Sequence, residues 1–206
     1  MSEIAPIILA AGLSSRFDSG PEETKLVVPL FGKPLVRRVA EAALASRARP
    51  ILVVTGHAAA KVEAALKTLD LSFIFNPGYR TGLASSLKAG IAALPASTAG
   101  ALIMLADMPF VSAGLIDHLI QAYEESAPVP LAVVPVRAGV RGNPVLIGRD
   151  LFDSIKSLEG DRGARAILDG AGKDVLECLV DDEAIGIDID TTKALRHLLL
   201  SLPHGG

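Results

Sequence analysis

Short apolar runs alternate with longer amphipathic or alanine-rich stretches along most of the chain. The apolar runs have the length and composition of β-strands, and we predict strands at residues 5–10, 51–55, 72–75, 101–106, 131–136, 175–180 and 185–189. Between them, the amphipathic stretches predict helices at residues 34–46, 58–69, 85–94, 112–125, 151–157, 163–168 and 191–200. Strands and helices therefore alternate as in repeated βαβ units.

The predicted strands have the pattern of a sheet that is buried on both faces. Residues 101–106, ALIMLA, are apolar throughout instead of alternating. In the helix that begins with Pro34, Leu35, Val36 and Val39 fall on one face, as packing against a sheet requires. We therefore predict an α/β fold, a Rossmann-like three-layer sandwich with a mostly parallel sheet. Ligands of such sheets bind beyond the carboxyl ends of the strands.

The composition of the chain indicates how many domains it has and which classes of protein it does not resemble. The 206 residues, half of them hydrophobic, suffice for one core, and we expect a single domain spanning residues 1–206. The formal charge of −3 and the 4% of aromatic residues argue against nucleic-acid binding, and no apolar run is long enough to cross a membrane. Because Cys178 is the only cysteine and residues 1–10 do not resemble a signal peptide, we expect a cytoplasmic protein.

The first strand leads directly into a loop of small residues followed by two cations. The sequence there is LAAGLSSR, and its candidate nucleotide-binding residues are Leu9, Ala10, Ala11, Gly12, Arg16 and Lys25. Small residues let a phosphate approach the main chain, and the two cations can offset the charge of a triphosphate. A tight turn with solvated cations is the alternative, because the loop matches neither G-x-G-x-x-G nor G-x-x-x-x-G-K-[ST].

Two later segments place carboxylates at strand ends. Asp107 follows ALIMLA directly, and Asp190 ends the alternating GIDID, in which Asp188 points the same way. Magnesium takes one or two protein carboxylates together with phosphate oxygens and waters, so Asp107 and Asp190 would suffice to hold it. Either residue could instead cap a helix, Asp107 the one near Ser112 and Asp190 the one at 191–200.

Three further segments carry polar residues beside glycines. In NPGYRTGLASSLKAG, the residues Gly82, Ser85 and Ser86 could contact a base or ribose, or the serines could be plain helix caps. VRGNPVLIG and LEGDRGAR could hold a phosphorylated second substrate, or simply present solvated charge, through Arg141, Asn143, Asp161 and Arg165. The four histidines show no metal-ligand spacing, and without a G-x-S-x-G elbow a triad hydrolase is not indicated.

Seven motifs in order carry a family resemblance. LAAGLSSR, Lys25 with LVVPLFGKPLV, NPGYRTGLASSLKAG, LADMP, RGNPVL, GDRGAR and DIDTT resemble the molybdenum cofactor cytidylyltransferase family of MobA-like NTP transferases. The resemblance runs from residue 7 to about residue 198. It implies a nucleotide-diphospho-sugar transferase-like fold and magnesium-dependent transfer of CMP from CTP, or of GMP from GTP in the sister enzymes, to the phosphate of molybdopterin, with release of pyrophosphate.

The resemblance also implies roles for residues. Gly12, Arg16 and Lys25 would hold the triphosphate, Ser85 and Ser86 would lie near the base and ribose, and Asp107 and Asp190 would bind magnesium. Arg16, Lys25 and Asp107 would form the catalytic set. The pterin would contact RGNPV and GDRGAR, through Arg141, Asn143, Pro144, Asp161 and Arg165. The product would pass to a molybdoenzyme of the xanthine dehydrogenase type.

The chain departs from the family pattern at two places. Arg16 and Lys25 are separated by FDSGPEET, with three acids, where the family has the shorter R-M-G-x-x-K, so we expect Lys25 to reach the phosphates after closure of the loop. DIDTTKAL replaces DIDTPEDL and loses a helix-start proline. Two alternatives remain: a transferase for another base or phosphorylated acceptor, and a protein of reduced turnover that escorts the finished cofactor.

Overall fold

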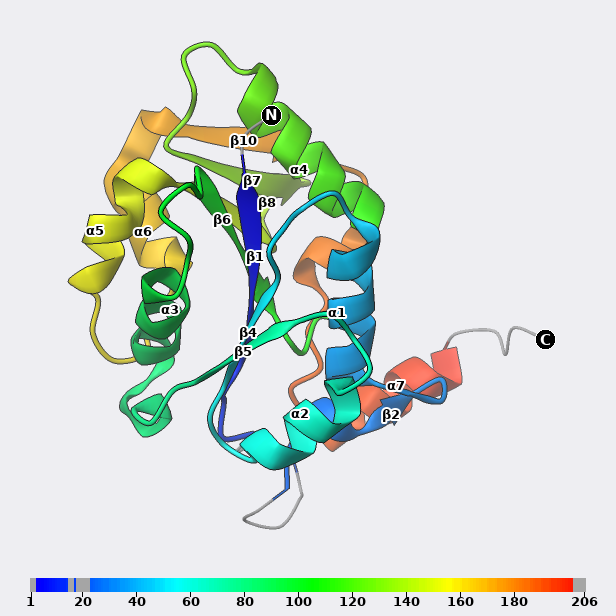
Figure 1. Ribbon diagram of the computed structural model, residues 1–206. Coiled ribbons are helices and arrows are strands. Elements are labelled where there is room, and N and C mark those ends of the chain that lie inside the picture. The colour runs from blue at the N-terminus through cyan, green and yellow to red at the C-terminus, as the bar shows by residue number, and fades with distance from the viewer. Residues whose placement is uncertain (1–2, 15–16, 18–22, 202–206) are drawn as a thin grey trace.

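A computed structural model describes residues 3–14, 17 and 23–201. The described residues form an eight-stranded mixed sheet in the order β10-β7-β9-β6-β1-β4-β5, with β8 paired to β7 (Figure 1). The main strands are β1 (Ile4–Ala10), β4 (Leu52–Thr55), β5 (Ser72–Phe75), β6 (Gly100–Leu105), β7 (Ala132–Arg137), β9 (Val145–Gly148) and β10 (Val175–Leu179). Most neighbours are parallel, which confirms the predicted α/β class.

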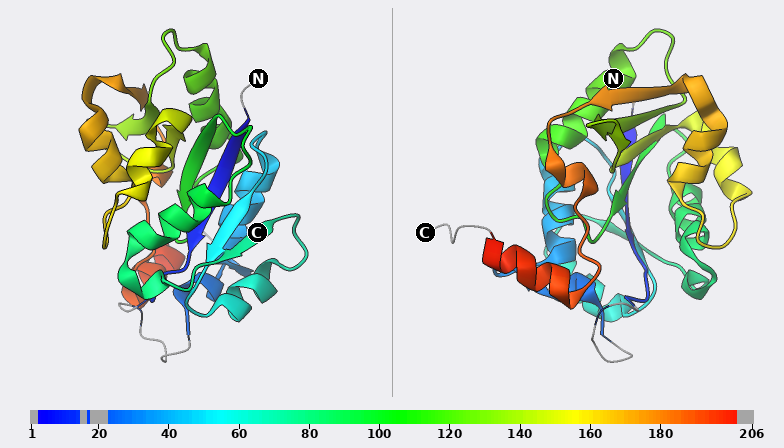
Figure 2. Two further views of the ribbon diagram at one scale, coloured as in Figure 1. Left: turned by 60° about the vertical axis from the view of Figure 1, so that its left-hand side comes forward. Right: turned by 180° about the vertical axis from the view of Figure 1, so that it is seen from behind.

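Helices cover both faces of this sheet, as Figures 1 and 2 show. One face carries α1 (Leu35–Ala45), α2 (Ala59–Leu66) and α4 (Ala113–Glu125), and the other carries α3 (Leu83–Ala92), α5 (Phe152–Lys156) and α6 (Ala164–Ala171). β1 divides its side chains between the two cores: Ile8 packs with the first group of helices, and Ile7 packs with the second. The three predicted layers are therefore present.

A third, smaller core joins distant parts of the chain. It contains Phe17, Leu30, Leu35, Ile189 and Leu195, so it packs α7 (Thr192–Ser201) beside the hairpin of β2 (Pro29–Leu30) and β3 (Lys33–Pro34). Figure 1 shows α7 and β2 side by side at the lower right. This core brings the segment before α7 to the carboxyl edge of the sheet, next to the residues that follow β1.

The remaining elements are short. They are β8 (Val140–Arg141) and the 3-10 turns η1 (Lys25–Val27), η2 (Tyr79–Thr81), η3 (Arg149–Leu151), η4 (Gly172–Asp174) and η5 (Glu183–Gly186). No helix in the described part of the chain is long and apolar enough to span a bilayer.

Two expectations about the fold are wrong. Residues 185–189 are not a strand: the Asp182 carboxylate accepts from the Ala184 N–H at 2.9 Å and begins η5 there, and Ile189 is buried in the third core. The second difference is β9, which lies between β6 and β7 and is antiparallel to both, whereas the sequence predicts no strand at these residues. Its apolar run VLIG has only four residues, too few for periodicity to identify a strand.

Candidate functional site

Three adjoining cavities form a cleft at the carboxyl ends of β1 and β6. Their volumes are about 330, 510 and 330 Å³, and all three are lined by Leu9 and Asp161. The first and second also share Gly12 and Asp107, and the second and third share Leu83. We call them the first, second and third cavity. Their position agrees with the general rule for ligand sites in α/β sheets.

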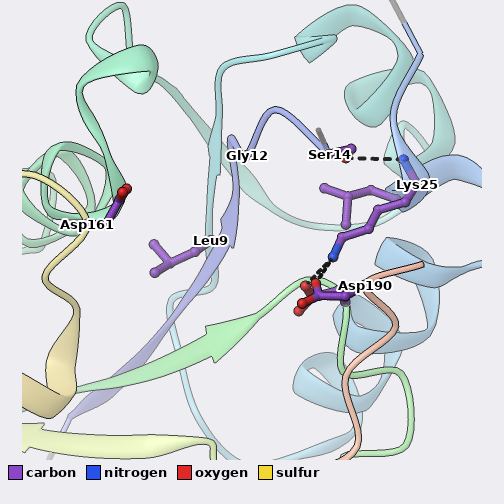
Figure 3. Close-up of a pocket in the computed structure, with 8 residues that line it drawn as sticks. Leu9, Gly12, Ser14, Lys25, Asp161 and Asp190 are labelled. Carbon is purple, nitrogen blue, oxygen red and sulfur yellow. Dashed lines mark hydrogen bonds and ion pairs between the residues drawn. The ribbon is translucent and has the colours of Figure 1, made fainter. Parts of the chain in front are cut away.

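The first cavity contains a lysine held between two carboxylates (Figure 3). The Lys25 ammonium donates to Asp107 Oδ2 at 2.7 Å and to Asp190 Oδ1 at 2.5 Å. Only 11% of the Lys25 side chain is exposed. The Ile189 N–H donates to the Asp107 carbonyl at 3.0 Å, which fastens the segment before α7 to the end of β6. The structure thus brings together three predicted site residues from distant parts of the chain.

The main chain of Lys25 is tied to the loop that follows β1. Its N–H donates to the Ser14 hydroxyl at 3.3 Å, and the Ser14 and Thr24 hydroxyls lie 3.2 Å apart. Thr24 also caps η1 by accepting from the Leu26 N–H. Lys25 therefore lines the same cavity as Gly12 and Ser14. Most of the insertion whose closure we expect lies outside the described residues.

Other residues than the two aspartates cap the helices that follow them. At α4, the Ser112 hydroxyl is the cap and accepts from the Leu115 N–H at 3.1 Å. At α7, the Thr191 hydroxyl accepts from the Ala194 N–H at 3.1 Å. Both carboxylates instead face the Lys25 ammonium. The cap alternatives for Asp107 and Asp190 are therefore not adopted.

The electrostatics of the first cavity favour cations. Burial on its own would lower the pKa of Lys25, but attraction to Asp107 and the hydrogen bonds to Asp107 and Asp190 outweigh it and raise the pKa above its ordinary value. Asp188 lies near the same group: burial raises the pKa of its carboxyl, and the charges of Asp190 and Asp107 raise it further. Negative charge is thus in excess beside a fully charged lysine.

A divalent metal fits the Asp107 and Asp190 pair. The two carboxylate oxygens already converge on one cation, the Lys25 ammonium. Within residues 3–14, 17 and 23–201, no group of three or more His, Cys, Asp or Glu side chains is arranged to hold a metal. A site of two carboxylates suits magnesium, which completes its shell with phosphate oxygens and waters, better than it suits zinc.

The second cavity is lined by the loop after β1 and the start of α3. Four candidate nucleotide-binding residues line it, Ala11, Gly12, Gly82 and Ser86, and so do Leu13, Tyr79 and Arg80. The Arg80 guanidinium stacks over the Tyr79 ring, 5.4 Å from its centroid. Tyr79 and Arg80 lie in NPGYRTGLASSLKAG but are not among the residues predicted for the site, because neither a tyrosine nor an arginine there has a spacing that marks a ligand contact.

The two serines of this motif differ in their surroundings. Ser85 lines none of the three cavities, and its hydroxyl lies 2.9 Å from the carbonyls of Gly78 and Gly82 and 2.8 Å from Asn76 Nδ2. Ser86 reaches the second cavity, and its hydroxyl accepts from Asn76 at 3.1 Å. Gly82, not a serine, is the N-cap residue of α3. Ser85 therefore stabilises the turn that precedes α3.

The third cavity combines an aliphatic floor with a polar rim. Its floor is formed by Ile103, Leu105, Val134, Val145 and Leu168, and its rim by the predicted residues Arg141, Asn143, Asp161 and Arg165. Arg141 Nε donates to Glu177 on β10 at 2.8 Å. Pro144, which was also predicted to contact the second substrate, lines none of the three cavities. It directly precedes Val145, the first residue of β9.

A close backbone contact connects the second and third cavities. The Ala84 N–H donates to the Gly160 carbonyl at 3.0 Å, at the start of α3. Gly82 has φ of +108°, and a Cβ there would overlap the carbonyl group of Gly160 and the N–H of Asp161. The loop that carries Asp161 is therefore packed directly onto the N-terminus of α3.

Two other predicted residues need separate mention. Arg16 lies outside the described residues. Ala10 is fully buried within β1 and lines none of the three cavities. Of the acidic insertion between Arg16 and Lys25, Glu23 is described: it pairs with Lys61 at 2.8 Å, and its carbonyl lies 2.9 Å from His57 Nε2. These contacts attach the end of the insertion to α2 and the loop before it.

The fold and the cleft define an α/β protein of the nucleotidyltransferase class. The model of the MobA-like NTP transferase domain matches residues 6–175, and the chain belongs to this family. Nucleotide transfer is the activity that the family supports, and the predicted family and fold are thereby confirmed.

Individual relatives carry different names. Nicotine blue oxidoreductase of Paenarthrobacter nicotinovorans is 30% identical over 95% of this chain and 96% of its own length. Molybdenum cofactor cytidylyltransferase of Escherichia coli K12 is 28% identical and covers 93% of each chain. The crystal structure of Rv0371c from Mycobacterium tuberculosis H37Rv superposes with a TM-score of 0.83 at 26% identity, over 97% of this chain and 99% of that one. Rv0371c has also been solved in complex with manganese, with a TM-score of 0.78 at 25% identity over 98% of this chain and all of that one.

Proposed function

We propose that this protein transfers CMP from CTP to the phosphate of molybdopterin, with magnesium, and releases pyrophosphate. The observation that carries the proposal is the Lys25 ammonium held between Asp107 and Asp190 in the cavity that Gly12 and Ser14 also line. A lysine, two carboxylates and a small-residue loop are the groups that a metal-bound triphosphate requires. The motif order and the relative named as a cytidylyltransferase support the choice of substrates.

The three cavities suggest how the substrates are arranged. The loop of Gly12 and Ser14 offers main-chain groups to the triphosphate beside Lys25, and the second cavity accepts the nucleoside between Gly12, Tyr79 and Gly82. The third cavity, with its aliphatic floor and charged rim, suits a flat acceptor that has polar edges. The product would be delivered to a molybdoenzyme of the xanthine dehydrogenase type.

The chemistry needs no general base from the protein. An oxygen of the acceptor phosphate, already ionised at pH 7, forms a bond to the α-phosphorus of CTP. The bond from that phosphorus to the bridging oxygen breaks, and pyrophosphate leaves with the electron pair. Lys25 stabilises the charge that develops on the departing group, and the walls of the cleft align the reacting phosphates. Magnesium held by Asp107 and Asp190 would neutralise further phosphate charge.

A pyrophosphate assay tests this proposal. The protein is incubated with magnesium, molybdopterin and each nucleoside triphosphate in turn, and released pyrophosphate is measured. We expect release with CTP that requires both magnesium and molybdopterin. Release with GTP instead would reassign the base, and release only with another phosphorylated acceptor would reassign the second substrate. Tight binding of the finished cofactor without pyrophosphate release would support the escort alternative.

A second candidate is reduction of an aromatic substrate. It is favoured by the near full-length similarity to a relative named nicotine blue oxidoreductase. The paired carboxylates around Lys25 favour transfer over reduction, because a hydride transfer has no need of a divalent metal site at that position. The test is incubation with nicotine blue and a reduced nicotinamide cofactor: bleaching of the dye without pyrophosphate formation would overturn the transferase proposal.

A further inference from the structure

We propose that Lys25 is an internal counter-cation that occupies the metal position between Asp107 and Asp190, and that metal binding therefore depends on the nucleotide. The inference deepens the proposed function and rests on its assignment of these carboxylates to a metal. It gives Lys25 two successive partners: the carboxylates in the free protein, and the triphosphate in the loaded one.

The geometry supports competition for one position. Lys25 Nζ lies within hydrogen-bond distance of one oxygen from each carboxylate, at 2.7 Å from Asp107 and 2.5 Å from Asp190. Figure 3 shows the end of the Lys25 side chain directed at the Asp190 carboxylate. A metal shared by the two carboxylates needs these inward-facing oxygens. The ammonium and the metal cannot both lie between them, because two cations at such short range repel strongly in a partly buried site.

The main chain of Lys25 is held in place by hydrogen bonds, whereas its side chain can turn from the carboxylates toward another part of the same cavity. Bonds to Ser14 and the cap at Thr24 fix the backbone on the loop that follows β1. The same cavity extends from the carboxylates to Gly12 and Ser14, where the proposed function places the triphosphate. A bound triphosphate gives the ammonium new anionic partners, so nucleotide binding would release the carboxylates for the metal. By linkage, the metal and the nucleotide then strengthen each other's binding.

A fixed structural ion pair is the competing explanation, and it makes a different prediction. If Lys25 only holds the segment before α7 against β6, removing its charge should lower stability and leave metal affinity unchanged. If Lys25 competes with the metal, removing its charge should tighten metal binding in the absence of any nucleotide. The two explanations therefore predict different metal affinities for the nucleotide-free protein, and this affinity can be measured without any catalytic turnover.

The test is Mn²⁺ binding to the nucleotide-free protein, measured by electron paramagnetic resonance. We expect Lys25→Met to bind Mn²⁺ about tenfold or more tightly than the unmodified protein, because the carboxylate pair then lacks the lysine that compensates part of its charge. Lys61→Met is the matched control, because it also removes one lysine from a 2.8 Å ion pair, with Glu23, but lies outside the three cavities. Equal Mn²⁺ affinity in both variants and the unmodified protein would overturn the inference.

A second measurement uses the unmodified protein and does not depend on the variant folding. Lysine labelling with an amine-reactive reagent, read by mass spectrometry, should find Lys25 protected in the metal-free protein and reactive once Mn²⁺ saturates it. Protection that persists at saturating Mn²⁺ would contradict displacement. Neither experiment contains a nucleotide or an acceptor, so both can succeed even if no pyrophosphate is released with any substrate. Failure of the inference about Lys25 can therefore be distinguished from failure of the proposed transferase function.

Discussion

The two ends of the cleft are built in opposite ways. In the first cavity, Lys25 is buried, and two carboxylates hold its charge. In the third cavity, the floor is aliphatic and the charges lie at the rim, where Arg141 pairs with the half-exposed Glu177. The charged groups of the first cavity are therefore largely buried and paired with one another, whereas the charged groups at the rim of the third cavity are substantially exposed to solvent. This difference suggests why one family can serve several acceptors.

The largest expected effect is at the buried end. Asp107→Asn should lower the rate of pyrophosphate release by about 10²- to 10³-fold, because the variant loses a charged group that the transition state requires. Asp117→Asn is the matched control, since Asp117 lies on α4, where its carboxylate accepts from the Arg47 N–H at 2.9 Å and lines none of the three cavities. Steady-state kinetics and thermal melting separate loss of rate from loss of fold. A near-normal rate in Asp107→Asn would remove this residue from the site.

The connection between the two ends is tested at Gly82. Gly82→Ala should lower the free energy of unfolding by about 2–3 kcal/mol, because its positive φ and its contact with Gly160 leave no room for a methyl group. Gly170→Ala, in α6 with open space around it, should instead raise that free energy by about 0.5–1 kcal/mol. Urea denaturation measures both. Full stability of Gly82→Ala would show that the loop of Asp161 is not packed against α3 as described.

The acceptor end should respond more weakly and more selectively. Arg165→Ala is expected to raise the KM for the acceptor about tenfold, or about 1.4 kcal/mol, and to leave the KM for the nucleotide unchanged. Among the described residues, Arg165 forms no ion pair, so its removal should not destabilise the fold. Arg162→Ala, three residues earlier and outside the three cavities, is the control. An equal rise in both KM values would contradict the division of the cleft.

The smallest effect is expected at the exposed ion pair. Glu177→Gln should change the free energy of unfolding by about 0.5 kcal/mol or less, because both partners of the Arg141–Glu177 bridge are substantially exposed. Denaturation with and without added salt measures it. A loss of several kcal/mol in the free energy of unfolding would mean that the ion pair at the rim of the third cavity stabilises the fold strongly. The contrast between the two ends of the cleft would then disappear.

The residues that follow predicted strands include several that line the three cavities of the structure. An unbroken apolar run such as ALIMLA predicts a buried strand, and Asp107 must then lie at the carboxyl edge with the loop after β1. The alternation in GIDID predicts a strand that would bring Asp190 to the same edge of the sheet. Asp190 does lie beside Asp107, but these residues do not form a strand. Burial of Ile189 in the third core positions Asp190 instead. That packing is tertiary and leaves no periodic signal.

Other features depend on contacts that a sequence does not record. β9 is specified by pairing with β6 and β7, although its four residues alone are compatible with a loop. The hydroxyl of Ser85 bonds to the turn before α3, and only the path of that turn shows why Ser85 lines none of the three cavities. The direct packing of Gly160 on Gly82 joins segments that are far apart in the chain. Hydrophobic pattern predicts which elements form, but not which loops touch.

The position of Asp190 beyond the last strand has a consequence for how the protein acquires its site during synthesis. Among the described residues, every strand of the sheet has been made once synthesis reaches Leu179, and the match to the family model ends at residue 175. The second carboxylate for Lys25 comes later, and the third core needs Leu195 to hold it in place. A nascent chain can thus build its sheet while the pair of carboxylates around Lys25 is still incomplete, and the folding of α7 onto the third core completes that pair.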